Sequence, residues 1–232
     1  MEDIVLMQRE RACAGTSRTN NEELEKNGYV VVKDFWSPEE LYHPVPRERG
    51  QIRYQGSVDR YENTEEVWEV NNSLTRYGHP QYKSLNAQIR KKLKDVVGRR
   101  VTNTFYYDRF CFDQNGVPKT VSGDNGEIIV LIPISTNMKK PWSTWIKKPD
   151  TYTDNQKSAI LIPGEESEIT LEPGDALIYK GCERPIWRES MPENYRTYKL
   201  GKLWVRFGNE ELYYHEIFFN YVLADGQRSY IK

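Results

Sequence analysis

The sequence predicts a mainly β protein, with some helix, folded as a barrel or sandwich. Eight short runs rich in β-branched and aromatic residues follow residue 100, and turn residues separate them. One amphipathic helix pattern precedes these runs, and no helix alternates with the strands, which argues against a βαβ arrangement. The 232 residues are 38% hydrophobic and 12% aromatic, which is enough for one sizeable core.

The N-terminal part predicts an arm followed by the start of the domain. Residues 1–27 are expected to form a polar arm, because a polar, charged terminal segment is usually mobile. Residues 28–232 are expected to form a single domain. The β-branched run at residues 28–35 predicts its first strand. Ser37 then begins a predicted helix, since serine can cap and a glutamate, Glu40, completes a capping box.

The middle of the sequence predicts an irregular segment followed by one helix. Residues 43–83 are rich in Tyr, Arg, Gly and Asn without a sustained period, so they are expected to be irregular with short strands. Residues 84–97 repeat apolar side chains at helical spacing, their other face is basic, and Gly98 follows as a helix stop. The basic face is expected to be solvated surface of a helix that covers a sheet.

The strands predicted after residue 100 give the domain its β character. Their spacing is short, and no internal repeat or low-complexity block interrupts them. They are Val101–Phe112, Glu127–Ser135, Trp142–Ile146, Ala159–Ile162, Glu168–Leu171, Ala176–Tyr179, Leu203–Phe207 and Tyr213–Leu223.

The composition favours a soluble intracellular protein. The 33 Lys plus Arg balance 34 Asp plus Glu, so the net charge does not indicate nucleic acid or an anionic membrane as a partner. No apolar run approaches the ~20 residues of a transmembrane helix, and the N-terminus lacks the order of a signal peptide. The three cysteines, Cys13, Cys111 and Cys182, are an odd number without metal-finger spacing and are expected to be reduced thiols.

Several short motifs occur in a recognisable order over roughly residues 70–230. They are the helix 84–97, the strand Thr104–Phe110, the turn Asn115-Gly116, the strand Glu127–Leu131, the hairpin at Pro141-Trp142, the string from Pro173 to Glu183 and the terminal Phe218–Tyr221. In this order they resemble the small iron(II)/2-oxoglutarate oxygenases of bacteria and tailed phages, and the string from Pro173 to Glu183 is the most specific of them. The resemblance implies a double-stranded β-helix, or jelly roll, with N-terminal covering helices.

The resemblance places three residues at the positions of the family's metal ligands. Those enzymes hold iron with a His-x-Asp pair and a distant histidine, which leaves coordination positions open for the keto acid and oxygen. Here Thr120 and Ser122 stand at the first pair and Ile186 at the distant histidine. None of the chain's three histidines, His43, His79 and His215, begins a His-x-Asp or His-x-Glu string. The resemblance therefore implies the fold but a degenerate metal site, with no catalytic residue, metal or cofactor.

Two acidic residues near this string have another interpretation. Asp124 and Glu127 are three residues apart and carry the oxygen ligands that hard cations prefer. However, Asp124-Asn125-Gly126 is also typical of a solvated turn. We favour the turn.

The resemblance also implies a candidate pocket for a small anion. The matching strands of the family line the keto-acid pocket, so Tyr107, Arg109, Arg196 and Tyr221 are its candidate residues here. A guanidinium can hold a carboxylate bidentately, and strand alternation puts Tyr107 and Arg109 on one face. In the competing interpretation, which we favour, Arg109 pairs with a neighbouring acid and the tyrosines pack at an edge. Arg188 belongs to a string that the family shares, so its presence is explained by fold as well as by binding.

Other chemistries find less support in the sequence. No histidine is positioned to activate Cys182, no phosphate-binding loop is present, and aromatic residues without excess positive charge do not predict base stacking.

The preferred hypothesis is a non-catalytic protein that binds protein partners by self-association or in a larger assembly, in the cytoplasm or in a phage virion or tail. The alternatives are an active oxygenase that uses iron(II) and 2-oxoglutarate at an unusual site, and a metal-free sensor of 2-oxoglutarate or a similar dicarboxylate.

Overall fold

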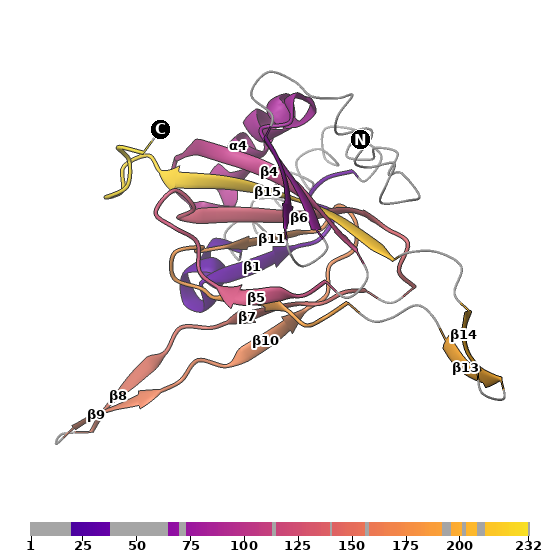
Figure 1. Ribbon diagram of the computed structural model, residues 1–232. Coiled ribbons are helices and arrows are strands. Elements are labelled where there is room, and N and C mark those ends of the chain that lie inside the picture. The colour runs from indigo at the N-terminus through magenta and orange to yellow at the C-terminus, as the bar shows by residue number, and fades with distance from the viewer. Residues whose placement is uncertain are drawn as a thin grey trace, which may run out of the picture.

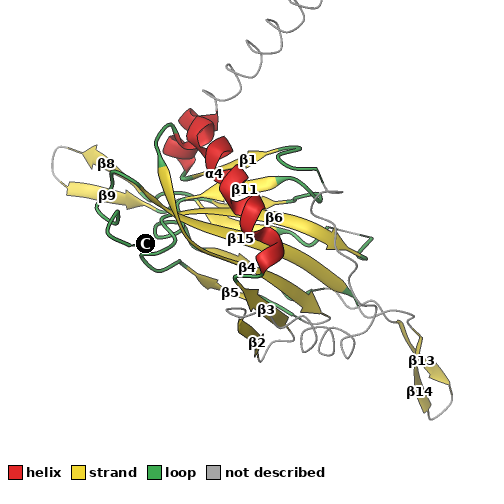
Figure 2. Ribbon diagram, turned by 90° about the horizontal axis from the view of Figure 1, so that it is seen from above, coloured by secondary structure: helices red, strands yellow, loops and turns green. Residues whose placement is uncertain are grey.

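The computed structural model shows two β-sheets packed face to face, with helices on the outer face of the larger sheet (Figures 1 and 2). It describes residues 20–37, 65–69, 73–112, 115–139, 141–155, 158–191, 196–200, 203–207 and 212–231.

The larger sheet has seven antiparallel strands in the order β1-β11-β6-β15-β4-β3-β2. Its two longest strands, β4 and β15, pair along most of their length at the centre. The neighbours β1, β11, β6, β15 and β4 are distant in sequence, as in a jelly roll, whereas β4, β3 and β2 at the other edge are consecutive strands. The bounds are β1 Tyr29–Val32, β2 Glu65–Glu69, β3 Ser73–Tyr77, β4 Val101–Phe112, β6 Ile128–Thr136, β11 Ala176–Tyr179 and β15 Tyr213–Leu223.

The smaller sheet has four strands in the order β10-β7-β12-β5. Two further hairpins, β8–β9 and β13–β14, project away from both sheets (Figures 1 and 2). The bounds are β5 Val117–Thr120, β7 Thr144–Lys147, β8 Thr151–Asn155, β9 Ser158–Ile162, β10 Glu166–Ile169, β12 Ile186–Arg188, β13 Arg196–Leu200 and β14 Leu203–Phe207.

The helical layer buries one face of the large sheet. Helix α4 (Lys83–Val97) follows the short 3-10 helix η1 (Pro80–Tyr82), and Gly98 ends it in the left-handed conformation with φ 70°. Its apolar stripe packs on alternate residues of β6 and β15, and Leu24 of the helical residues 20–27 joins the same core. The other residues of β6 and β15, such as Leu131 and Phe218, face the small sheet. Each central strand therefore contributes to both cores.

The turn at Pro173-Gly174-Asp175 fixes the edge strand β1 to the sheet. The Asp175 carboxylate accepts hydrogen bonds from the backbone N–H groups of Glu172 and Asp34, at 2.9 and 3.1 Å. It also pairs with Lys33 at 2.6 Å. Gly174 has φ 92°, where a side chain would be strained. The most specific string of the sequence thus has a structural role.

The structure confirms a mainly β jelly roll and the predicted helix, and it corrects several local predictions. Residues 20–27 are helical, although we expected a mobile arm. The strands β5, β8, β12 and β13 lie where we predicted none. The expected helix beyond Ser37 falls on residues 38–40, outside the described residues, as do residues 1–19, Cys13 and His43. Among the described helices, none is long and apolar enough to cross a membrane.

Candidate functional site

A cavity of about 120 Å³ lies between the two sheets. Strands β4, β6, β11 and β15 contribute one side, and β5, β12 and the residues after β5 contribute the other. Aromatic and aliphatic side chains form most of its wall, and none of the described residues that line it carries a carboxylate. The lining residues are Phe105, Tyr107, Arg109, Val117, Thr120, Val121, Ser122, Ile129, Tyr179, Ile186, Phe218 and Asn220.

The three positions matched to metal ligands meet at this cavity. Ile186 and Thr120 are direct partners across β12 and β5, and Ile186 also pairs with Ile146 of β7. Ser122 lies just beyond β5, where its backbone N–H donates to the Gly181 carbonyl at 2.9 Å. Segments more than sixty residues apart in sequence are thereby brought together at one cavity.

The chemistry of these three side chains does not fit an iron ion. Thr120 and Ser122 present neutral hydroxyls, which are weak ligands for iron, and Ile186 has no lone pair. Ile186 is instead 8% exposed and packs in the core between the sheets with Ile129 and Phe218. Within the described ranges, no group of three His, Cys, Asp or Glu side chains is arranged to hold a metal.

The carboxylates of Asp124 and Glu127 have partners outside the cavity. The guanidinium of Arg228 donates to the Asp124 carboxylate at 2.8 Å, on the surface. Glu127 accepts the backbone N–H of Leu223 at 2.9 Å, and its other oxygen lies 3.9 Å from Arg228. Neither carboxylate lines the cavity between the sheets. Both are held in place by the C-terminal segment.

Arg109 of β4 lines the cavity but already has a partner. Its Nε and Nη2 both donate to Oε1 of Glu216, at 3.1 and 2.7 Å. Arg188 of β12 donates to the other oxygen of Glu216, also at 2.7 Å. The side chains of Glu216 and Arg188 are 0% and 2% exposed, and that of Arg109 is 14% exposed. Two guanidiniums therefore share one buried carboxylate, and the trio has a net charge of +1.

The Glu216 carboxylate keeps Arg109 and Arg188 charged despite their burial. Burial alone would lower the pKa of Arg109, but the Glu216 carboxylate outweighs it and the pKa is raised. The same balance raises the pKa of Arg188. Burial also raises the pKa of the Tyr179 hydroxyl well above its usual value, so this cavity residue is a neutral phenol.

The other predicted pocket residues are distributed differently. Tyr107 shares the cavity face with Arg109, as alternation predicted, and its ring stacks on Phe218 with centroids 4.7 Å apart. Tyr221 points to the opposite face of β15, where its hydroxyl donates to the Asn86 side chain of α4 at 2.7 Å. Placing Tyr221 in the pocket was therefore wrong. Arg196 lies on the projecting β13–β14 hairpin, and its side chain is outside the described residues.

Asn220 lines the cavity, and sequence reasoning missed it. It is 2% exposed, and its Nδ2 has no hydrogen-bond partner in the part of the chain that the structure describes. Because side chains alternate along a strand, Asn220 and Phe218 share the face that Tyr221 does not. The signal was present in the strand pattern, since a lone polar residue sits among apolar ones at Phe218–Val222.

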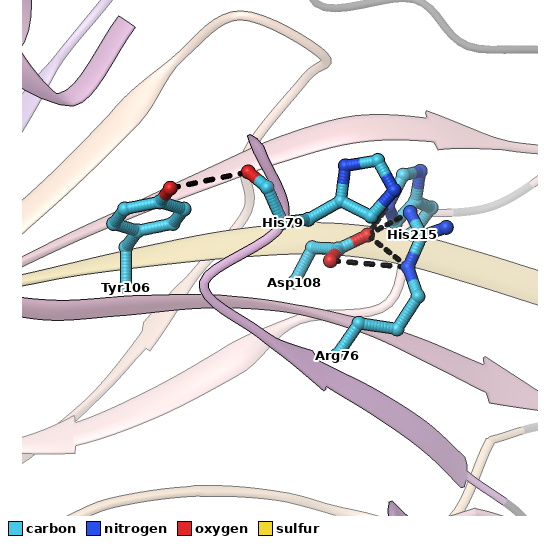
Figure 3. A network of polar contacts seen from close by, with 5 residues as sticks. All are labelled: Arg76, His79, Tyr106, Asp108 and His215. Carbon is cyan, nitrogen blue, oxygen red and sulfur yellow. Dashed lines mark hydrogen bonds and ion pairs between the residues drawn. The ribbon is translucent and has the colours of Figure 1, made fainter. Parts of the chain in front are cut away.

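A second buried network lies on the face of the large sheet that η1 and α4 cover. Figure 3 shows Arg76 and His215 converging on Asp108, next to His79, whose backbone carbonyl accepts a hydrogen bond from Tyr106. The Asp108 carboxylate lies 2.5 Å from Arg76 and 2.8 Å from Nε2 of His215. The side chains of Asp108 and His215 are fully buried.

This network holds an ionised aspartate and a neutral histidine. Burial would raise the pKa of Asp108, but Arg76 and His215 outweigh it and the pKa falls to about 2. Burial lowers the pKa of His215, although Asp108 opposes that effect. The neutral ring donates from Nε2 to Asp108 and stacks on Phe110 with centroids 3.7 Å apart. This geometry is typical of a structural ion pair between Arg76 and Asp108, to which the buried imidazole of His215 adds a hydrogen bond.

Solved structures with similar folds include a non-haem α-ketoglutarate-dependent carbocyclase, a prolyl-4-hydroxylase and a 2OG-Fe(II) oxygenase family protein. No family model and no curated protein matches the sequence. The carbocyclase SnoK of nogalamycin biosynthesis superimposes with a TM-score of 0.55 and 9% identity, covering 92% of this chain and 90% of SnoK. A prolyl-4-hydroxylase from Pseudomonas putida gives 0.53 and 8%, covering 88% and 98%. A 2OG-Fe(II) oxygenase family oxidoreductase from Burkholderia pseudomallei gives 0.53 and 11%, covering 88% and 89%.

At these identities the likeness concerns the fold and not the site. The two packed sheets and the cavity between them agree with it. The chain therefore has the double-stranded β-helix fold of the iron(II)/2-oxoglutarate-dependent oxygenases.

Proposed function

We propose that this protein is a non-catalytic member of the oxygenase fold that acts by binding. One observation carries the proposal: Thr120, Ser122 and Ile186 meet at the cavity between the sheets, and none of them is an effective iron ligand. Because these three residues meet, the alignment of this sequence with the oxygenase motifs is supported. The absence of iron ligands is then a property of the site and does not result from a misalignment.

The electrostatics of the cavity also disfavour a divalent cation. Arg109 lines the wall, and with Arg188 and Glu216 it contributes a net positive charge in a poorly hydrated interior. Like charges repel strongly where water is excluded. An iron ion at Thr120 would have neither anionic ligands to hold it nor a carboxylate in the cavity wall to balance it.

The test is an anaerobic calorimetric titration with iron(II), with and without 2-oxoglutarate, followed by an oxygen-dependent succinate assay. The proposal predicts no stoichiometric iron binding and no succinate above the rate with free iron. Tight iron binding together with succinate release would overturn it. That result would establish the alternative, an active oxygenase with an unusual ligand set.

Two projecting hairpins support a binding role. Within the described residues, β8 pairs only with β9 and β13 only with β14. An isolated two-stranded hairpin is marginally stable in water, so such arms are typically stabilised by contact with another chain. On β9, Leu161 and Ile162 are 49% and 45% exposed. We propose that these arms serve self-association or a larger assembly; a phage virion or tail setting rests on the sequence resemblance alone.

The self-association proposal is testable with a surface variant. Leu161→Ser/Ile162→Ser removes apolar surface from the β9 arm without touching either core. Light scattering coupled to size exclusion should show oligomers of the wild-type protein that dissociate in the variant. A monomeric wild-type protein at high concentration would rule out self-association through this arm.

A further inference from the structure

We propose that two copies of this chain associate through the free edge of β1, so that their large sheets join into one continuous antiparallel sheet across a two-fold axis. The inference goes beyond the proposed function, because strand pairing at β1 does not depend on what the cavity binds. It assigns an interaction surface to β1 from its place in the sheet, its backbone hydrogen bonds and its composition.

Strand β1 lies at one border of the large sheet, with β2 at the other (Figure 2). Within the described residues its only strand partner is β11, so the other side of β1 has no neighbouring strand. An edge of this kind presents a row of backbone N–H and C=O groups, to which a strand of another chain can pair.

The hydrogen bonds at the start of β1 show which backbone groups face the free side. In an antiparallel pair, residues that bond to the partner strand alternate with residues whose backbone groups point away from it. The N–H of Lys180 donates to the Gly28 carbonyl at 2.9 Å, and the register of β1 and β11 places these two residues opposite each other. The alternation then leaves the N–H and C=O groups of Tyr29 and Val31 on the free side. None of these backbone groups has a hydrogen-bond partner among the described residues.

The composition of β1 differs from that of the other outer strands of the two sheets. β2 contains three glutamates, β10 contains Glu166 and Glu168, and β5 contains Pro118 and Lys119. Charged residues and proline at an edge hinder pairing with another chain. β1 has the sequence Tyr-Val-Val-Val, with high β-propensity, no charged residue and no proline. Among these outer strands, β1 is therefore the one suited to strand addition.

The free backbone groups of β1 are complementary to themselves, which selects a second copy as the partner. With a two-fold axis beside Val30 and perpendicular to the strand, Tyr29 of each copy lies opposite Val31 of the other. Each such pair exchanges two hydrogen bonds, so every free N–H and C=O of these residues gains a partner. The same patch is used on both copies, so the contact closes at two.

The side chains of β1 favour the same arrangement. Val30 and Val32 pack in the core beneath α4, and Tyr29 and Val31 pack in the core between the sheets. Val31 and Val32 are still partly exposed. Pairing would bury this apolar surface against the same surface of the second copy, and β1 brings no charge into the contact.

Analytical ultracentrifugation from micromolar concentration upward tests for the dimer, and amide hydrogen exchange tests the pairing. The amides of Tyr29 and Val31 should exchange slowly in the dimer and faster after dilution to monomer, because their hydrogen bonds lie between the copies. The amides of Val30 and Val32 face β11 and should stay protected in both samples. This comparison uses the unsubstituted chain, so it decides the inference even where a variant fails to fold.

One variant removes a donor at the edge, and two serve as controls. Val31→Pro removes an outward N–H and leaves the hydrogen bonds to β11 in place. It deletes two of the four hydrogen bonds across the axis, so dimerisation should weaken by about tenfold or more. Val31→Thr keeps the N–H and the branched shape and should keep the dimer. Leu161→Ser/Ile162→Ser alters only the β9 arm and should also leave the β1 dimer intact.

The outcomes separate this inference from the proposed function. A protein that is monomeric at every concentration would overturn the inference, as would a dimer that Val31→Pro leaves unchanged. A dimer that only the arm variant dissociates would overturn it and would favour the β9 arm as the contact. Slow exchange of the Tyr29 and Val31 amides in a monomeric sample would also overturn it, because the edge would then be covered within one chain. Each of these results leaves the non-catalytic proposal standing, since the iron titration tests that proposal separately.

Discussion

Ile186 and Thr120 are direct partners on β12 and β5, and both line the cavity between the sheets. The resemblance matched these residues to the distant histidine and to the first histidine of an iron site. Their side chains are a hydroxyl and a hydrocarbon, and neither is an effective iron ligand. Ile186 packs instead as a residue of the core between the sheets.

Restoring the ligand types should create a metal site. The triple variant Thr120→His/Ser122→Asp/Ile186→His places two imidazoles and a carboxylate at the converging positions, the ligand set of non-haem iron sites. We expect stoichiometric cobalt(II) binding, with ligand-field bands in the visible spectrum. The matched variant with alanine at the same three positions should bind no cobalt. Absence of binding by a folded triple variant would show that the three side chains do not converge as described.

Glu216 should be among the most sensitive positions for stability. Glu216→Gln leaves Arg109 and Arg188 buried beside each other without a carboxylate, and breaking a buried pair of this kind costs about 3–5 kcal/mol. Urea unfolding measures the loss. Glu183→Gln, at a surface pair with Arg184, should stay within about 0.5 kcal/mol of the wild type. Similar stability of both variants would contradict the role assigned to the buried trio.

The stability should fall on the acidic side in two stages. The folded pKa of His215 lies below its ordinary value of 6.5, so below pH 6.5 the unfolded chain binds a proton that the folded protein does not. Stability therefore decreases as the pH falls through that range. The folded pKa of Asp108 is about 2 against an ordinary 3.8, so its contribution is present above pH 3.8 and is lost as the pH falls towards 2.

Two variants identify these stages in urea unfolding measured across pH. His215→Gln should remove the decrease that begins near pH 6.5, because glutamine does not titrate. Asp108→Asn should lower stability at neutral pH and flatten the curve between pH 3.8 and 2. A wild-type curve that is level from pH 7 down to 4 would contradict the assignment for His215.

The hydroxyl of Tyr221 should contribute to stability. Tyr221→Phe removes its hydrogen bond to Asn86 of α4, and losing such a buried hydrogen bond costs about 1 kcal/mol. Urea unfolding measures the loss. Tyr230→Phe, at an exposed tyrosine, should stay within about 0.5 kcal/mol of the wild type. Equal stability of the two variants would contradict the role assigned to the Tyr221 hydroxyl.

Elements with a locally complete pattern could be predicted from sequence whatever their length. The bounds of β4, β11, β14 and β15 agree with the predicted runs, and α4 differs by one residue at its start. β5 and β12 lacked such a signal. β12 has only three residues, and β5 contains Pro118, which its edge position in the small sheet tolerates.

The sequence indicated that Arg109 pairs with an acid, and Glu216 is that acid, but the partners in the charged interior could not be identified because they are distant in sequence. Arg109 and Glu216 are 107 positions apart, as are Asp108 and His215. These pairs are apparent only when β4 and β15 are aligned in register. The face of Tyr221 depended on the same pairing, and this is why the candidate pocket included Tyr221 and omitted its neighbour Asn220.

Adjacent positions on β15 contribute to opposite cores: His215 supports Asp108 on one side, and Glu216 joins two arginines on the other. A shift of one residue exchanges the two faces of a strand. It would place the Glu216 carboxylate beside Asp108 and the His215 imidazole between two guanidiniums, in an interior where like charges repel strongly. Apolar residues alone would tolerate such a shift more readily, since both cores are aliphatic and aromatic. His215 and Glu216, each with its own distant partners, therefore disfavour a one-residue mispairing of β15 during folding.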